Sequence, residues 1–421
     1  MAILRCPSCG AEPPRAPPDF ACACGELLDV EHAFRPLQRA LFDGRLGSRE
    51  PPLDSGVWRF RELVYHRFPS EAVVSLREGN TPLLRSREVA RWAGIDHLRL
   101  KHEGLNPTGS FKDRGMTVAV SRAAASGARV LACASTGNTA ASLAAYAAAA
   151  GLRAVVVAPE AGTALGKLSQ ALAYGARTLL VRGDFDQALR LVLELARAGE
   201  VDLLNSVNPF RIEGQKSIVL EILQELLWQP PDWIVFPAGN LGNCAAFGKA
   251  LREARALGLI ERTPRLAAVQ ASGAAPFAAA FRTGFQRLVP VRAETVASAI
   301  RIGDPASWRR AARSIRETNG LVIEVGDQAI LDAKAVVDSA GIGAEPASCA
   351  ALAGAKKLAL RGEIDAGERV VCVLTGHLLK DPETTLAYHQ GRLAGVRPAR
   401  ANPPRVIEPR LDELRAALQP D

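Results

Sequence analysis

The sequence predicts an α/β protein whose core is a parallel β-sheet covered by helices on both faces. From about residue 80 onward, short continuous apolar runs alternate with longer stretches of helical periodicity. Apolar runs without polar alternation are typical of strands buried on both faces, as strands of a parallel sheet are. No fixed-period repeat or low-complexity tract interrupts the pattern.

Seven apolar runs are expected to be strands: Arg129–Ala134, Leu152–Ala158, Ala176–Val181, Trp233–Pro237, Leu266–Gln270, Leu321–Val325 and Val370–Leu374. Helices are expected at Thr139–Ala150, Leu165–Tyr174, Asp184–Ala198 and Gly214–Trp228. The last of these has an apolar stripe made of Ile218, Val219, Ile222, Leu223, Leu226 and Leu227. Open parallel sheets bind ligands beyond the C-terminal ends of their strands, so informative residues are expected in strand-to-helix loops.

Size and charge limit the function classes. A chain of 421 residues is long for one core, which favours two or three domains. The net charge of +8 is dispersed along the chain, so we expect no nucleic-acid partner. This charge fits small anionic ligands, or it serves solubility alone. The N-terminus lacks the pattern of a secretory signal, and no stretch is apolar enough for a membrane span, so a cytoplasmic location is expected.

The segment His102–Gly115, HEGLNPTGSFKDRG, places a lysine at the start of a helix. Ser110 is expected to cap the helix, with Lys112 in its first turn. The helix dipole there repels a cation and favours the neutral, nucleophilic amine, which can form an imine with an aldehyde cofactor. The alternative is a solvated lysine beside Asp113 and Arg114.

Two further loops follow predicted strands. The first has backbone amides suited to a cofactor phosphate, and it consists of Gly239, Asn240, Leu241, Gly242 and Asn243. It lacks the lysine of a P-loop and the spacing of a dinucleotide site, and a tight turn would also favour Gly and Asn. The second offers Ser135, Asn138 and Thr139 to a carboxylate or a phenolic oxygen, unless it is only an elaborate helix cap.

Two more segments complete the candidate site. Asn205, Ser206 and Arg211 would suit an anion, because arginine gives forked hydrogen bonds to phosphate; the alternative is an Arg211–Glu213 ion pair. Thr375, after the last strand, has a hydroxyl that can bond a pyridine nitrogen, although strand-end turn chemistry also explains it. His377 is expected to be a surface histidine.

Taken in order, these motifs resemble a known enzyme family. They are EGNTPL (Glu78–Leu83), NPTGSFKDRG (Asn106–Gly115), STGNTAAS (Ser135–Ser142), GKLSQALAYGA (Gly166–Ala176), NSVNPFRIEGQKS (Asn205–Ser217), GNLGN (Gly239–Asn243), EPAS (Glu345–Ser348) and TGHLLKD (Thr375–Asp381). The chain resembles the pyridoxal-phosphate family of the tryptophan synthase β chain, the serine and threonine dehydratases and the threonine synthases, and is most similar to the last. The resemblance covers roughly residues 55 to 390.

The resemblance implies two doubly wound open parallel-sheet domains with pyridoxal 5'-phosphate between them. Lys112 would hold the cofactor covalently and move protons, Asn138 would bond its phenolic oxygen, the loop 239–243 its phosphate, and Thr375 its pyridine nitrogen. Ser135 and Thr139 would lie near a small phosphorylated amino acid, whose phosphate would meet Asn205, Ser206 and Arg211. The reaction would be γ-elimination of phosphate followed by addition of water at Cβ.

Alternatives to this reaction remain within and outside the family. A cysteate synthase also needs a phosphate site, and a threonine or serine ammonia-lyase uses the same cofactor. A catalytically silent binding protein would have no need to keep Lys112, Asn138 and Thr375 together. The resemblance also suggests a homodimer.

Four cysteines near the N-terminus form a knuckle that looks like a zinc ribbon: Cys6, Cys9, Cys22 and Cys24. Its second arm is C-x-C where C-x-x-C is usual, so a metal-free ribbon is the alternative. We expect a structural role. The other cysteines, Cys133, Cys244, Cys349 and Cys372, are expected to be buried small side chains.

The expected division of the chain has four parts. Residues 1–30 form the knuckle, and residues 31–78 pack on the main body. Residues 79–395 form the catalytic core, with a smaller subdomain inserted at about 120–205. Residues 396–421 form a C-terminal tail.

Overall fold

The computed structural model describes residues 2–13, 20–160 and 165–418. Its larger sheet has six strands in the order β11-β10-β9-β12-β4-β3. Their bounds are β3 (Leu83–Leu84), β4 (His97–His102), β9 (Trp233–Pro237), β10 (Arg265–Ala271), β11 (Leu321–Val325) and β12 (Arg369–Leu374). All neighbours pair in parallel except β3, which runs antiparallel to β4 at the edge.

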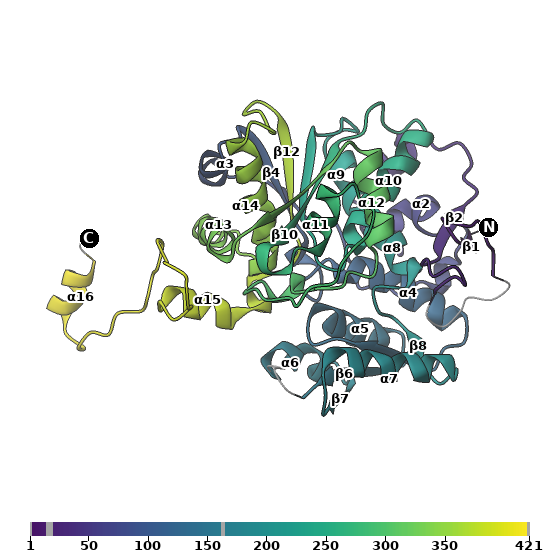
Figure 1. The fold of residues 1–421 in the computed structure, drawn as a ribbon, viewed down its shortest axis with the longest axis horizontal. Coiled ribbons are helices and arrows are strands. Elements are labelled where there is room, and N and C mark those ends of the chain that lie inside the picture. The colour runs from purple at the N-terminus through teal and green to yellow at the C-terminus, as the bar shows by residue number, and fades with distance from the viewer. Residues whose placement is uncertain (1, 14–19, 161–164, 419–421) are drawn as a thin grey trace.

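A second, four-stranded sheet has the order β7-β6-β5-β8, with every pair parallel. Its strands are β5 (Val130–Ala134), β6 (Arg153–Pro159), β7 (Arg177–Val181) and β8 (Asp202–Leu203). The helices of this unit are α5 (Asn138–Ala149), α6 (Leu165–Ala173) and α7 (Phe185–Arg197). In Figure 1 this unit lies below the larger sheet, so the molecule has two units, each built on its own open sheet.

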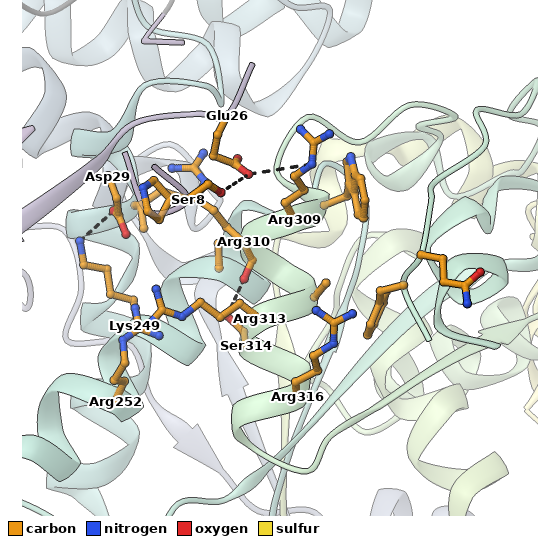
Figure 2. Close-up of a pocket in the computed structure, with 17 residues that line it drawn as sticks. Ser8, Glu26, Asp29, Lys249, Arg252, Arg309, Arg310, Arg313, Ser314 and Arg316 are labelled. Atoms are coloured by element: carbon orange, nitrogen blue, oxygen red, sulfur yellow. Dashed lines mark hydrogen bonds and ion pairs between the residues drawn. The ribbon is translucent and has the colours of Figure 1, made fainter. Parts of the chain in front are cut away.

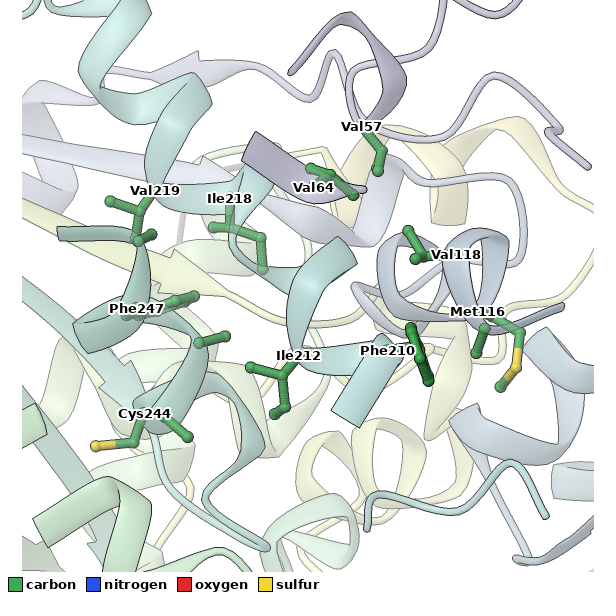
Figure 3. Packing of buried hydrophobic residues seen from close by; sticks show 14 of the residues in the cluster. Val57, Val64, Met116, Val118, Phe210, Ile212, Ile218, Val219, Cys244 and Phe247 are labelled. Atoms are coloured by element: carbon green, nitrogen blue, oxygen red, sulfur yellow. The ribbon is translucent and has the colours of Figure 1, made fainter. Parts of the chain in front are cut away.

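Helices cover both faces of the larger sheet. On one side α14 (Pro346–Leu360) packs on β9 and β12, with α13 (Asp327–Ser339) and α3 (Arg87–Ala93) beside it. The other helices of the main body are α1 (Arg39–Asp43), α2 (Arg61–Val64), α4 (Lys112–Ala125), α8 (Pro209–Gln215), α9 (Ser217–Glu225), α10 (Gly242–Ala256), α11 (Pro276–Arg282) and α12 (Trp308–Glu317). Side chains from α2, α4, α8, α9 and α10 interlock in one apolar core (Figure 3).

Helices α4 and α8 touch at two glycines. A Cβ atom on Gly214 would lie 1.8 Å from the carbonyl oxygen of Arg114, and one on Gly115 would lie 2.8 Å from that of Arg211. No larger residue fits at either position, because the two backbones are in contact there. The glycines therefore set the distance between the helix that carries Lys112 and the helix that carries Arg211.

The strand predictions are confirmed, with ends shifted by a residue or less, but β4, β8 and the edge strand β3 were not predicted. The single helix expected at Gly214–Trp228 is wrong. The helical region starts earlier, at Pro209, is divided at Lys216 and ends at Glu225. Leu227 follows the end in a left-handed conformation (φ +54°) and is 79% exposed, so it is not part of the apolar stripe.

The N-terminal knuckle contributes the antiparallel pair β1 (Ala2–Arg5) and β2 (Asp29–His32). At the other end, α15 (Pro382–His389) packs near the body, whereas α16 (Leu411–Ala417) stands apart from it (Figure 1). Cys133, Cys244, Cys349 and Cys372 are buried, as predicted. Within the described ranges, every helix is too short or too polar to cross a bilayer.

Candidate active site

Lys112 is the first residue of α4, and the loop before it is tied to the end of β12. The Phe111 N–H donates to the Thr375 carbonyl oxygen at 3.0 Å, and Ser110 forms a bridge with Gly376. The expected cap by Ser110 is wrong: the N-cap residue is Phe111, and the buried Ser110 Oγ has no partner among the described residues. This pairing of two loops brings Lys112 beside Thr375.

The Lys112 amine is held in an environment that favours its neutral form. Burial, and then the positive charge of Arg211, lower its pKa to about 7, against a smaller opposing effect of Glu345. Its Nζ lies 4.3 Å from the centroid of the Phe111 ring, and no described residue accepts a hydrogen bond from it. An amine that is partly neutral near pH 7 is able to act as a nucleophile or a base.

The alternative was a solvated lysine beside two surface charges; Lys112 is half-buried, and its two neighbours are not surface charges. Asp113 and Arg114 are fully buried. The Asp113 carboxylate accepts hydrogen bonds from the backbone and hydroxyl of Thr108, at 2.7 and 2.6 Å. Burial nonetheless raises the Asp113 pKa to about 6. Both neighbours of Lys112 therefore point into the protein and fix the first turn of α4.

Arg211, in α8, is a buried cation with few partners. Its Nη1 donates to the Leu204 carbonyl oxygen at 3.0 Å, while Nε and Nη2 have no partner among the described residues. Burial lowers its pKa to about 10. The predicted alternative, an ion pair with Glu213, is wrong, because that carboxylate binds Lys216, Lys249 and His32. Arg211 thus offers two N–H groups to an anion.

The loop between β9 and α10 offers several backbone donors. No described residue accepts a hydrogen bond from the N–H groups of residues 239–243. The loop turns through Leu241 in a left-handed conformation (φ +64°), and the buried Asn243 Oδ1 has no partner in the described structure. A Cβ atom on Gly239 would lie 3.1 Å from the Ile300 Cα, so the loop is closely packed on one side. These features suit a phosphate held by amides at a helix start.

Asn240 and Ser206 connect this loop to the segment before α8. The Asn240 Nδ2 donates to the Ser206 Oγ, and its Oδ1 accepts from the Ala306 N–H at 2.7 Å. Asn205, next to Ser206, uses both ends of its amide on the backbone of Ala134, at 2.9 Å each. The Asn205 side chain thereby fixes the segment of Ser206 to the end of β5.

Asn138 starts α5 and donates to both carboxylate oxygens of Glu345, at 3.3 and 3.1 Å. Glu345 precedes α14, and burial raises its pKa. A Cβ atom on Gly376 would lie 2.5 Å from Glu345 Oε1, so the carboxylate is packed directly on the loop of Thr375. Glu345 was missed as a site residue, although its motif EPAS is part of the resemblance. The signal that could have found it is an acidic residue directly before a helical Pro.

The remaining predicted residues lie around these contacts. Ser135 and Thr139 are half-buried in the loop before and at the start of α5, and the Ser135 Oγ accepts from the Gly137 N–H at 3.3 Å. The Thr375 hydroxyl is buried, 3.1 Å from the Ser348 Oγ of α14. His377 is half-buried, and its Nδ1 accepts from the Leu379 N–H at 3.2 Å.

The candidate residues therefore occupy loops beyond the C-terminal ends of β4, β5, β8, β9 and β12. Hydrogen bonds join them in pairs: Phe111 to Thr375, Asn240 to Ser206, and Asn138 to Glu345. The half-buried Lys112, the buried Arg211 and Glu345, and a set of free backbone donors meet in this region. Such a site is able to bind anionic groups and to exchange a proton with a bound molecule.

The four knuckle cysteines form a separate cluster. Their sulfur atoms all lie within 4.8 Å of one another, with Cys6 and Cys24 3.5 Å apart and Cys9 and Cys22 3.6 Å apart. Four thiolates around one zinc ion at about 2.3 Å would place sulfur atoms about 3.8 Å from one another. The cluster has the size of a tetrahedral metal site.

The chain belongs to the pyridoxal-phosphate dependent enzyme family, whose model matches residues 74–376. The family prediction is confirmed. The free donors at 239–243 and the unpaired guanidinium of Arg211 also fit an anionic cofactor and an anionic substrate.

Two curated relatives match nearly the whole chain, and both are threonine synthases. The chain is 44% identical to a threonine synthase of Methanocaldococcus jannaschii, over 91% of this chain and 94% of that one. It is 43% identical to a threonine synthase of Methanosarcina acetivorans, over 99% of each. The structure of threonine synthase from Escherichia coli superimposes with a TM-score of 0.69 at 19% identity, covering 92% of this chain and 91% of that chain, which supports the fold.

Proposed function

We propose that the chain converts O-phospho-L-homoserine and water into L-threonine and phosphate, with pyridoxal 5'-phosphate as its cofactor. The threonine synthase relatives support this reaction over nearly the whole chain. The observation that carries it is Arg211, a buried guanidinium with two unpartnered N–H groups that acts electrostatically on Lys112. A second anion site beside the lysine is necessary for a phosphorylated substrate and has no use in a serine dehydratase.

Bound pyridoxal phosphate supplies an aldehyde for a lysine amine and a ring that withdraws electrons from the substrate carbons. We propose that Lys112 holds it. The backbone N–H groups of Gly239, Asn240, Leu241, Gly242 and Asn243 would receive its phosphate, because none of them has an acceptor in the described structure. Asn138 would face its phenolic oxygen, and Thr375 its pyridine nitrogen.

The substrate would be oriented by the loops on either side. Ser206 and Arg211 would bind its phosphate, and Ser135 and Thr139 would lie at its amino-acid end. Asn205 would contribute by holding the Ser206 segment, since its amide is bonded to Ala134. An arginine with two free N–H groups would bind the phosphate firmly as it leaves.

Lys112 would move the protons of the reaction. A pKa near 7 lets the amine take a proton from one substrate carbon and return it to another. In the net reaction the Cγ–O bond to phosphate and one Cβ–H bond break, the hydroxyl of water joins Cβ, one proton is delivered to Cγ, and the other proton leaves with the phosphate. Burial around Lys112 and Arg211 keeps bulk water from competing with these transfers.

The test is a product assay on the purified protein loaded with pyridoxal phosphate. O-Phosphohomoserine is added, and phosphate and threonine are both measured, with Lys112→Ala as the control. Equal amounts of the two products, absent in the control, support the proposal. Phosphate without threonine would contradict the water-addition step. Turnover of phosphoserine with sulfite, or release of ammonia from threonine, would favour the cysteate synthase or ammonia-lyase alternative.

We further propose that Cys6, Cys9, Cys22 and Cys24 hold a structural zinc ion, as the spacing of their sulfur atoms suggests. Zinc measured by elemental analysis is expected at one ion per chain, and it should be lost in Cys9→Ser with little change in kcat. A zinc-free protein of full thermal stability would favour the metal-free ribbon instead.

The assembly and division of the chain complete the proposal. We propose a cytoplasmic homodimer, with a knuckle at residues 1–30, a packing segment at 31–78, a catalytic core at 79–395 and a tail at 396–421. The four-stranded sheet would correspond to the inserted subdomain at about 120–205. Light scattering of the purified protein would test the dimer.

A further inference from the structure

A cavity of about 370 Å³ lies between the knuckle and helices α10 and α12 (Figure 2). None of the residues proposed to hold the cofactor, the substrate or the metal lines it. Ser8, Glu26 and Asp29 form its knuckle side, and Trp308 and Phe285 are the aromatic residues of its wall. The cavity is distinct from the candidate active site.

The lining of this cavity is strongly basic. Six of its side chains are cationic and two are acidic. The cations are Lys249, Arg252, Arg309, Arg310, Arg313 and Arg316, and the acids are Glu26 and Asp29. Arg309, Arg313 and Arg316 share one face of α12, because they are spaced by four and three residues.

Protein carboxylates neutralise only part of this charge. Lys249 is fully compensated, with Asp29 at 2.9 Å and Glu213 beside it. Arg252 and Arg313 share a single carboxylate, Glu317, at 2.6 and 2.7 Å.

The other arginines have weaker partners. Arg309 lies 4.0 Å from Glu26, and Arg316 donates to the carbonyl oxygen of Gly284 at 2.8 Å. Five guanidinium groups therefore face three carboxylates, Glu26, Asp29 and Glu317, and Asp29 is already bound to Lys249, which leaves a net positive field in the cavity.

One of these arginines is built into the wall. Arg310 is only 7% exposed, and its pKa is lowered, chiefly by burial. Its Nη1 donates to Leu28 O at 3.3 Å and its Nη2 to Ser307 Oγ at 3.2 Å, both long bonds. Its Nε is buried without a partner among the described residues. A buried, incompletely bonded guanidinium is costly unless an anion completes its coordination.

We propose that this cavity binds a small phosphorylated anion, in a site separate from catalysis. Planar guanidinium groups bind phosphate oxygens in pairs, and Arg309 and Arg316 are pre-oriented by stacking on Trp308 and Phe285, at 5.1 and 5.2 Å. The cavity volume accommodates a ligand with two adjacent phosphate groups. Inorganic pyrophosphate is the simplest probe of this chemistry.

The bound anion would act on catalysis through two helices. Ile212, which follows Arg211 in α8, and Ala245, in the first turn of α10 after the loop 239–243, both line the cavity. An anion that draws α12 toward the knuckle would shift the contacts that α8 and α10 make with the cavity. Its effect on turnover is therefore expected as a change in KM for the phosphorylated substrate.

Isothermal titration of pyrophosphate into the cofactor-loaded protein tests the site. The background is Arg211→Leu, so that the proposed substrate site does not contribute. We expect saturable binding at millimolar concentration or below, weakened by roughly tenfold or more in Arg309→Gln/Arg313→Gln, which removes two charged contacts. The matched control, Arg361→Gln/Arg392→Gln, removes two exposed arginines elsewhere and should leave binding unchanged.

Arg309 and Arg313 have side chains 54% and 49% exposed, so their replacement should preserve the fold, as a melting curve would verify. Absence of pyrophosphate binding, or binding that is equal in the two double variants, would overturn the proposal. Neither outcome affects the threonine assay, so failure here is distinguishable from failure of the proposed reaction.

Discussion

Arg114 and Arg211 are two buried arginines on helices that touch, and their surroundings are opposite. Arg114 donates to Glu103, Glu221, Thr81 and Ser217, and these carboxylates raise its pKa despite its burial. Arg211 donates to one carbonyl group, and its pKa is lowered to about 10. Both arginines are fully buried, but the charge of Arg114 is neutralised by carboxylates, whereas the charge of Arg211 has no anionic partner in the described structure.

The difference in surroundings distinguishes charges that hold the fold together from charges that are available to a ligand. The cluster around Arg114 also contains Lys101, which binds Glu221 at 2.8 Å, so cations and carboxylates there are matched. The cluster around Arg211 contains Lys112, a second cation with no hydrogen-bond acceptor among the described residues. Unmatched buried charge is expensive, and proteins retain it where a ligand completes it.

Replacement of Lys112 should have the largest effect on turnover. Lys112→Ala is expected to lower kcat by roughly a thousandfold or more, because the proton carrier is lost. The free energy of unfolding of the cofactor-free protein should not fall, since the lysine has no partner to lose. Product assays and urea unfolding measure the two quantities. A large loss of stability would place Lys112 with the structural charges and break the comparison.

Arg114→Leu tests the other cluster. Its removal leaves Glu103 and Glu221 buried without their main cation, so unfolding should become easier by about 3–5 kcal/mol. Urea denaturation followed by circular dichroism gives this value. Arg182→Leu, at an exposed ion pair with Glu160, is the control and should change stability by less than about 1 kcal/mol. An equally mild effect of Arg114→Leu would contradict a structural role for the matched cluster.

Arg211→Leu should show the reverse pattern. We expect kcat/KM for O-phosphohomoserine to fall by roughly a hundredfold, from the loss of two charged hydrogen bonds, with a much smaller loss of folding stability than in Arg114→Leu, because only the bond to Leu204 is lost. Steady-state kinetics and the same urea titration measure both. If stability falls as far as in Arg114→Leu while KM is unchanged, Arg211 is a structural residue.

A pH series sharpens the comparison further. Burial lowers the Lys112 pKa to about 7, so the amine is protonated below that pH and neutral above it. The rate at which cofactor-free protein captures pyridoxal phosphate should therefore rise by about tenfold between pH 6 and 8. Stopped-flow absorbance measures the rate. In Arg211→Leu the midpoint should move to higher pH, because a neighbouring positive charge is gone; an unmoved midpoint would exclude the coupling.

The sequence predicted the elements of this site better than its contacts. The strands and the loops after them were found because continuous apolar runs mark buried parallel strands. Strand β4 was missed because four of its six residues, HLRLKH, are basic types, and the buried Lys101 is paired with Glu221 and Glu225, more than a hundred residues away. Glu345 was missed for the same reason, since it meets Asn138 across 207 residues. Pairings of this kind depend on the fold, so the local sequence does not show which distant residue each group contacts.

The bond between His32 and Glu213, at 2.7 Å, has a consequence for how this chain can be shortened. Together with the Lys249–Asp29 pair, it makes strand β2 part of the wall behind α8. The knuckle is therefore not a removable module: cutting it away would expose Glu213 and Lys249 and loosen the helix that holds Arg211. A truncated version would need Glu213 in α8 and Lys249 in α10 to be replaced as well, because both would lose their N-terminal partners.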